Sequence, residues 1–210
     1  MNKYFQKNSF IFSKLSFANP YFWFYKLTGC LTINSEKEKK IAKELSPNIS
    51  VRYLETRWYI RQSLGDIFNL NPIEVPLIAE PNKPPKIRDG LGYISISHCK
   101  DALIIVWANS KIGIDIERCD RNFDHELVLK KITNKKDIEF NKVKSINVLN
   151  NWCCLESAIK WDQGSIIKDI NSWEYNKFDL SMFHKEKKIK LNIKQFYFYD
   201  WTIAIASKKN

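Results

Sequence analysis

Two acidic residues lie two positions apart in the segment Lys111-Ile-Gly-Ile-Asp-Ile-Glu. The isoleucines alternate with Gly113, Asp115 and Glu117, which is the period of a β-strand, so both carboxylates are expected on one face. Neighbouring carboxylates repel one another, and their burial would require a pKa shift or a bound cation. Gly113 is expected to leave open space beside them. The alternative is a strand whose acidic face is exposed to water.

Glu156 and Lys160 are four residues apart in a segment with helical periodicity. This spacing places both at one border of the predicted apolar stripe, from which they can reach a cleft together. The alternative is an exposed ion pair, which would contribute only about 0.3–0.5 kcal/mol. With Asp115 and Glu117, Glu156 completes a set of three carboxylates suited to Mg²⁺, with Mn²⁺ as the other candidate ion. A lysine beside such a set suits a phosphate group.

The segment Ser97-His98-Cys99 closes a predicted strand and holds one of only three histidines in the chain. Adjacent residues of a strand point to opposite faces, so a nucleophilic pair of His98 and Cys99 is disfavoured. A histidine of the core or of a turn is the simpler interpretation. Arg57 and Arg61 are four residues apart on a predicted helix, and a solvated helix face is the simplest interpretation of this pair.

The elements that must position these residues can be predicted from residue spacing. The aromatic N-terminal segment, residues 1–27, is predicted to contribute strand to the core. Ser35 and Glu38 form a capping box that opens a helix, which should end near residues 46–47. A second helix is predicted over residues 50–69.

The rest of the chain alternates between strands and helices. Prolines exclude helix from residues 71–90 and suggest a loop with a short edge strand. Residues 93–117 predict consecutive strands, and residues 122–147 are polar and predicted to be helical in pieces. An amphipathic helix and C-terminal strands follow. The segment that starts at Asp101 resembles the one that starts at Asp200, which hints at two related halves.

Composition sets the class of protein. The chain has 210 residues, 44% of them hydrophobic, which is enough for one well-cored domain or two small ones. The net charge of +11 favours a partner rich in phosphate or carboxylate, although solubility alone is an alternative. Five irregularly spaced cysteines argue against a disulfide framework and favour a reducing cytoplasm. The N-terminal apolar stretches are short and broken, so we expect no membrane span and no signal peptide.

Three segments, in this order, resemble the signature blocks of the 4′-phosphopantetheinyl transferase superfamily, in its single-chain, surfactin-synthetase-activating type. They are Ser97-His98-Cys99, the segment 113–117 and the segment 152–160. The helix around Arg57 and the loop Asn82-Lys83-Pro84 are similar to two further family features. The resemblance implies an α+β fold of two similar halves, residues 1–107 and 108–210. These halves would pack with pseudo-twofold symmetry around an active site at their interface, in a monomer.

The resemblance also implies an activity. The enzyme would transfer the phosphopantetheine arm of coenzyme A to a serine of an apo acyl or peptidyl carrier protein, releasing adenosine 3′,5′-bisphosphate. The implied metal ligands are Asp115, Glu117 and Glu156, and Glu156 is also the implied base for the serine hydroxyl. The implied contacts to the coenzyme are Lys160 at the pyrophosphate, Ser97 and His98 at the phosphates, and Arg57, or Arg61, with Lys83 at the 3′-phosphate and adenine end. The carrier is expected to contact the region that contains Phe123 and Leu127.

Three departures from the family pattern bear on activity. Leu155 replaces a lysine that usually precedes the helix glutamate, which removes one cation from the phosphate region. Asn82 replaces the usual glycine of the Gly-Lys-Pro loop, and Cys99 replaces a serine. A catalytically weakened homologue is therefore one alternative. The others are a basic nucleic-acid-binding protein and a Mg²⁺-dependent nuclease, although the helical spacing of Glu156 and Lys160 argues against the nuclease.

Overall fold

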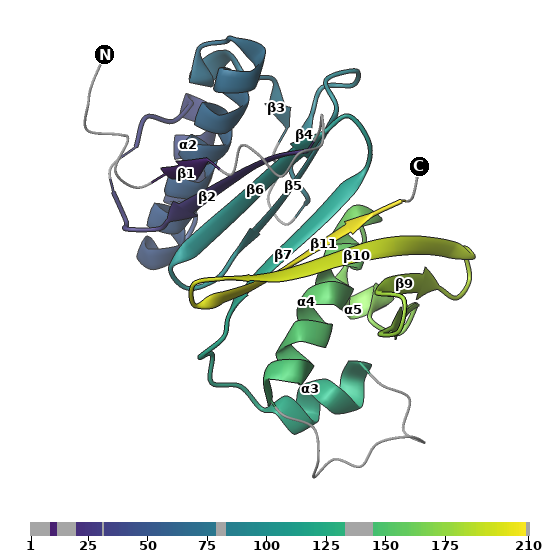
Figure 1. Cartoon of the computed structure of the whole chain (residues 1–210). Coiled ribbons are helices and arrows are strands. Elements are labelled where there is room, and N and C mark those ends of the chain that lie inside the picture. The colour runs from purple at the N-terminus through teal and green to yellow at the C-terminus, as the bar shows by residue number, and fades with distance from the viewer. Residues whose placement is uncertain (1–8, 12–19, 31, 79–82, 133–144, 209–210) are drawn as a thin grey trace. The chain divides into compact units, whose positions relative to one another are not determined.

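The computed structural model describes residues 9–11, 20–30, 32–78, 83–132 and 145–208, and it is a mixed α+β structure, as predicted (Figure 1). Its elements in chain order are β1 (Ser9–Ile11), β2 (Tyr21–Lys26), α1 (Glu36–Lys43), α2 (Pro47–Phe68), the 3-10 helix η1 (Pro72–Glu74), β3 (Leu77–Ile78), β4 (Lys86–Ile87), β5 (Tyr93–His98), β6 (Ala102–Ala108), β7 (Ile112–Arg118), α3 (His125–Ile132), α4 (Ser145–Trp161), α5 (Ile166–Asp169), β8 (Trp173–Asn176), β9 (Ser181–His184), β10 (Ile189–Phe198) and β11 (Trp201–Ser207).

The chain folds into two compact units. The first comprises Met1–Ile94 and Lys100–Ser110, and the second comprises Ser95–Cys99 and Lys111–Asn210. Strand β5 therefore contributes residues to both units. Within the described part of the chain, no helix combines the length and the apolarity that a membrane crossing requires.

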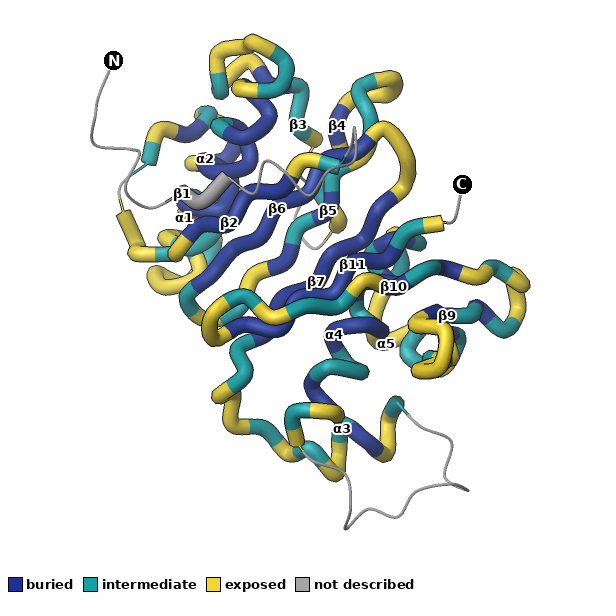
Figure 2. The backbone as a smooth tube through the Cα atoms, in the orientation of Figure 1, coloured by how far each residue is buried: buried dark blue, intermediate teal, exposed yellow. Residues whose placement is uncertain are grey.

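The first unit is built on strands in the order β1-β2-β6-β5 and on the helices α1 and α2. All seven residues of β6 are buried, as the dark blue tube in Figure 2 shows. The predicted capping box is present, because Ser35 accepts a hydrogen bond from the Glu38 amide and the Glu38 carboxylate accepts one from the Ser35 amide. Both predicted helices are present, but α1 ends at Lys43, before the predicted end near residues 46–47, and α2 begins at Pro47, before the predicted start at residue 50.

Two details of the first unit differ from the predictions or lie outside the description. The proline-rich segment forms the short strands β3 and β4, as expected, but it also contains η1. Proline is compatible with the first turn of a helix because the amide it lacks has no partner there, so prolines did not exclude this turn. Of the predicted N-terminal strand, β1 and β2 are described, and residues 1–8 and 12–19 lie outside the described residues.

The second unit contains an antiparallel sheet in the order β7-β11-β10-β9-β8. Helix α4 packs on this sheet and covers a buried core. Members of this core include Cys153, Ile159, Met182, Leu191 and Ala204. Helix α3 is part of the polar region predicted to be helical in pieces, and residues 133–144 of that region lie outside the described residues.

The strand pairs of the two units repeat one pattern. In the first unit β2 pairs antiparallel with β6, and in the second β7 pairs antiparallel with β11. Each pair ends with the same hydrogen bond, since the Leu27 amide donates to the Asp101 carbonyl at 2.9 Å and the Cys119 amide donates to the Asp200 carbonyl at 2.7 Å. The sequence similarity after Asp101 and Asp200 therefore has a counterpart in the local structure of each unit.

Candidate metal centre

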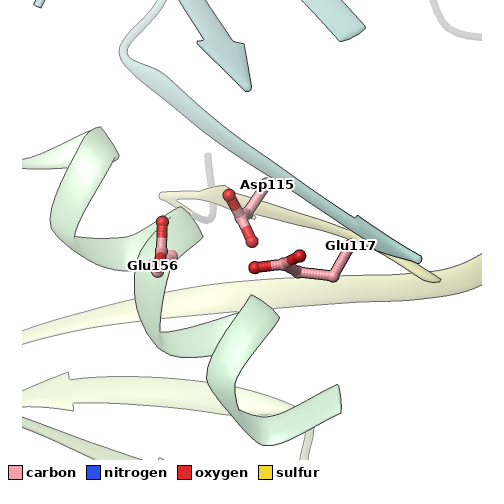
Figure 3. A group of neighbouring side chains, drawn as sticks. All are labelled: Asp115, Glu117 and Glu156. Atoms are coloured by element: carbon pink, nitrogen blue, oxygen red, sulfur yellow. The ribbon is translucent and has the colours of Figure 1, made fainter. Parts of the chain in front are cut away.

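Three carboxylates converge in the second unit. Strand β7 carries Asp115 and Glu117, helix α4 carries Glu156, and their side chains point toward one another (Figure 3). One carboxylate oxygen of each residue lies within 4.8 Å of the others. Asp115 is only 2% exposed and Glu117 only 8%. The predicted convergence is confirmed, and the alternative of an acidic face exposed to water is wrong because α4 covers this face of the strand.

Gly113 allows α4 to come this close. A Cβ atom at Gly113 would lie 2.0 Å from the Ser157 carbonyl oxygen and 2.5 Å from the Trp161 amide nitrogen. The expectation that Gly113 leaves open space is therefore wrong, because helix backbone fills that space. On β11, Ala204 and Ala206 are the register partners of Asp115 and Gly113, so this part of the sheet presents small side chains to the helix.

Lys160 and Ser97 complete the buried polar cluster. The Lys160 ammonium donates to the Asp115 Oδ1 atom at 2.5 Å and lies 3.5 Å from the Glu156 Oε2 atom. The Ser97 hydroxyl donates to the same Oδ1 atom at 2.6 Å and accepts from Lys160 at 2.8 Å. The other Asp115 oxygen, Oδ2, is buried and has no hydrogen-bond partner among the described residues. A buried carboxylate oxygen without a partner is costly unless a further donor or a cation meets it.

Sequence analysis missed one member of the cluster. Arg121 forms an ion pair with Glu117 and is half exposed. It lies beyond the end of β7, where the chain turns back after Asp120, so the strand period does not place it beside Glu117. The turn closed by the hydrogen bond from the Arg121 amide to the Arg118 carbonyl brings the two together.

The electrostatics of the cluster favour an added cation. Burial, and then the Asp115 charge, raise the pKa of Glu156 to about 8, although Lys160 opposes the shift. Burial and Asp115 also raise the pKa of Glu117, against the influence of Arg121. Burial alone would lower the pKa of Lys160, but Asp115 and Glu156 raise it above its ordinary value. The carboxylates are therefore incompletely neutralised by the side chains around them.

The residues present fit a hard divalent cation. All three candidate ligands are oxygen donors, they come from two rigid elements, and the Asp115 Oδ2 atom is available. Mg²⁺ prefers such oxygen ligands and usually keeps several waters, which leaves positions for substrate phosphates. The arrangement can therefore hold a metal and present it, with Lys160, to an anionic substrate.

The structure brings together five of the site residues that the sequence resemblance implies. Those five are Asp115, Glu117, Glu156, Lys160 and Ser97. His98 ends β5 in the same unit and is exposed. Arg57 and Lys83 belong to the first unit, where Arg57 is buried in α2 and Lys83 is exposed in the loop before β4, and Asn82 lies outside the described residues.

Arg57 and Arg61 of α2 have different surroundings. Arg61 donates from Nε to Glu38 at 2.9 Å and from Nη1 to the Val75 carbonyl at 2.9 Å. The Arg57 guanidinium lies 4.8 Å from the centre of the Tyr53 ring, and its Nε and Nη1 atoms have no hydrogen-bond partner among the described residues. Arg57 is 8% exposed and Arg61 is 7% exposed. Both are therefore buried, and the interpretation of a solvated helix face is wrong. Arg61 joins α2 to α1 through Glu38, whereas the Nε and Nη1 donors of Arg57 are unused among the residues that the structure describes.

A cavity of about 810 Å³ lies in the second unit on another side of α4. Leu155, which directly precedes Glu156, lines it together with Trp173 and Met182. The Trp173 indole nitrogen is buried and has no hydrogen-bond partner in the part of the chain that is described. Three lysines also line the cavity, namely Lys131, Lys177 and Lys185. The cavity can take an apolar chain that carries a polar or anionic end.

No model of a known protein family matches the chain, and no curated protein matches it significantly.

Proposed function

We propose that the protein is a 4′-phosphopantetheinyl transferase. It transfers the phosphopantetheine arm of coenzyme A to a serine hydroxyl of an apo acyl or peptidyl carrier protein, and it releases adenosine 3′,5′-bisphosphate. The observation that carries this proposal is the buried cluster of Asp115, Glu117 and Glu156 beside Lys160, because three oxygen ligands and one ammonium suit a metal-bound pyrophosphate. The order of the sequence blocks around these residues supports the same activity.

The chain's own residues supply proton transfer and charge neutralisation. A bound Mg²⁺, held by Asp115, Glu117 and Glu156, would neutralise the pyrophosphate charge. Glu156 accepts the proton of the carrier serine hydroxyl, and the serine oxygen bonds to the β-phosphorus of coenzyme A. The bond from that phosphorus to the bridging oxygen breaks, and the electron pair leaves with adenosine 3′,5′-bisphosphate.

Cationic and hydroxyl groups hold the coenzyme. Lys160, already beside the carboxylates, donates to the pyrophosphate, and Ser97 orients the Lys160 ammonium. His98 contacts a phosphate. In the first unit, Arg57 binds the 3′-phosphate with Lys83, and its unpartnered guanidinium nitrogens support this choice over Arg61, whose donors are occupied.

The proposal extends to the fold and to the arm of the coenzyme. The repeated strand pairs support two related halves, and the family resemblance implies pseudo-twofold symmetry with the active site at their interface. The cavity beside Leu155 is large enough for an extended pantetheine arm. An aliphatic Leu155 would then contact the arm where the family usually has lysine.

Intact mass spectrometry tests the proposal. An apo acyl carrier protein is incubated with the protein, coenzyme A and Mg²⁺, and the gain of one phosphopantetheine is expected. Glu117→Gln keeps the shape of the side chain and removes a ligand charge, so it should abolish the gain. Glu186→Gln, which changes an exposed glutamate of the same unit, is the matched control and should leave the gain intact.

Coenzyme binding distinguishes the alternatives. If the folded protein binds neither coenzyme A nor Mg²⁺, the transferase function is contradicted. Binding without transfer to any of several carriers would favour the weakened homologue. The nucleic-acid-binding alternative would use Arg57, Arg61 and exposed aromatic residues for phosphate contacts and stacking, and the burial of both arginines weakens it.

A further inference from the structure

Thr202 is a buried polar residue beside the carboxylates that none of the proposed roles uses. It lies on β11 as the register partner of Glu117, and it is 0% exposed. The next two β11 residues on the same face are Ala204 and Ala206. A hydroxyl at this position therefore needs partners, and the partners that it has connect the sheet to α4.

Thr202 contacts α4 at two points. Its hydroxyl donates to the Asn150 Oδ1 atom at 2.9 Å, and its carbonyl oxygen accepts from the Cys153 thiol at 3.7 Å. Residues three apart lie on one side of a helix, so Asn150, Cys153 and Glu156 follow one another along α4. The contacts of Thr202 thus lie one and two turns before the carboxylate that α4 contributes to the site.

The side chains around Thr202 form a continuous hydrogen-bond network. Gln195 donates from Nε2 to the Thr202 hydroxyl at 3.3 Å, and the Cys154 thiol donates to the Gln195 Oε1 atom at 3.8 Å. At the outer end, Asn150 donates to the Tyr197 hydroxyl at 2.6 Å. The Thr202 hydroxyl joins β11 to α4, while Cys154 and Asn150 also join α4 directly to β10.

A second contact holds the other end of α4. The Trp161 indole donates to the Lys111 carbonyl at 2.9 Å, and Gly113 lies directly against the helix backbone. Glu156 lies between this contact and Asn150. The helix is therefore held before and after Glu156, to two adjacent strands of one sheet.

We infer that Thr202 and Asn150 are positioning residues for the metal site, which set the place of Glu156 relative to Asp115 and Glu117. The inference rests on the proposed metal site. Ligand oxygens must meet a metal within a few tenths of an ångström, and partners that orient ligands commonly change metal affinity by about 10–100-fold. A shift of α4 along the sheet would move Glu156 and leave the two ligands of β7 in place.

Binding of Mn²⁺ alone, followed by electron paramagnetic resonance of the free ion, tests this inference in the full-length chain. Thr202→Val keeps the shape of the side chain and removes the hydroxyl, and we expect about tenfold weaker Mn²⁺ binding. Thr202→Ser keeps the hydroxyl and should stay within about twofold of the unchanged protein. Asn150 is partly exposed, and Asn150→Ala should also weaken Mn²⁺ binding. This variant tests the inference if Thr202→Val does not fold.

The outcomes separate positioning from general stability. Tyr197→Phe removes only the outermost hydrogen bond and should retain the Mn²⁺ affinity. If Thr202→Val and Asn150→Ala unfold at lower denaturant concentration but bind Mn²⁺ as the unchanged protein does, the residues are merely structural and the inference is overturned. If the unchanged protein binds no Mn²⁺, the proposed metal site is contradicted, and so is the inference that rests on it.

Discussion

Two side-chain cations contact the three carboxylates within the described chain: Lys160 meets Asp115 and Glu156, and Arg121 meets Glu117. A divalent cation that binds the same oxygens must compete with the Lys160 ammonium, which lies 2.5 Å from Asp115. A phosphate substrate offers that ammonium another partner. Lys160 should therefore oppose binding of the metal alone and favour binding of the coenzyme.

Replacement of Lys160 separates these two effects. Lys160→Met should bind Mn²⁺ alone severalfold more tightly, because a competing charge is gone, and it should bind coenzyme A more weakly. Titrations of both ligands by calorimetry measure the two affinities. Lys130→Met removes the same charge from an exposed helix position and should change neither. Equal changes in both variants would attribute the effect to net charge rather than to contact.

The raised pKa of Glu156 makes stability depend on pH. Burial, and then Asp115, raise this pKa from 4.5 to about 8, so the folded protein binds a proton that the unfolded chain releases. In the presence of a chelator, the free energy of unfolding should fall as pH rises from about 4.5 to about 8. Denaturant titrations across this range measure the trend.

The control for this prediction is Glu156→Gln, which carries no proton to lose. Its free energy of unfolding should change less with pH over the same interval. Metal binding requires the ionised carboxylate, so the affinity for Mn²⁺ should increase with pH in the unchanged protein. A flat pH dependence of stability in the metal-free protein would contradict the burial of this carboxylate.

At the scale of elements, the contact of β7 with α4 depends on Gly113. A methyl group there meets helix backbone rather than a mobile side chain, so Gly113→Ala should cost about 3 kcal/mol of unfolding free energy. Gly90→Ala is the control, since nothing lies within 4 Å and only the positive φ of 84° opposes it, at about 1 kcal/mol. Chemical denaturation of both variants compares the two costs. Similar losses would show that α4 can move away from β7 easily.

Helix α2 carries two arginines for which we predict opposite effects. Arg61→Met leaves the buried Glu38 carboxylate without its ion pair and should cost about 3–5 kcal/mol of unfolding free energy. Arg57→Met removes a buried guanidinium with unused donors, so stability should hold or increase while coenzyme A binding weakens about tenfold or more. Denaturation and calorimetry on both variants measure the contrast. A stability loss in Arg57→Met with unchanged coenzyme binding would make Arg57 structural.

At the scale of the whole molecule, the net charge of +11 favours association with an acidic carrier protein. Screening shortens the range of this attraction to about 10 Å at 0.1 M salt. The value of kcat/KM for an acidic carrier should therefore fall about tenfold as salt rises from about 0.05 to 0.5 M, with kcat less affected. Initial rates at several salt concentrations measure this dependence. A salt-independent kcat/KM would exclude electrostatic steering.

Much of the site could be predicted from the sequence because its information is local. A period of two places Asp115 and Glu117 on one face of a strand, and a spacing of four places Glu156 and Lys160 together on a helix. The capping box of Ser35 and the apolar runs of the strands depend equally on neighbours in the chain. These properties follow from backbone geometry, which is the same wherever the element lies.

Other properties depend on which element covers which, and only the tertiary structure decides that. Gly113 was expected to face open space and instead meets α4, because spacing along one strand says nothing about what packs on it. The burial of Arg57 and Arg61 and the hydrogen bond from Thr202 to Asn150 depend on contacts between segments that are distant in the chain. Local secondary structure could therefore be predicted from the sequence, whereas burial and long-range pairing depend on tertiary packing.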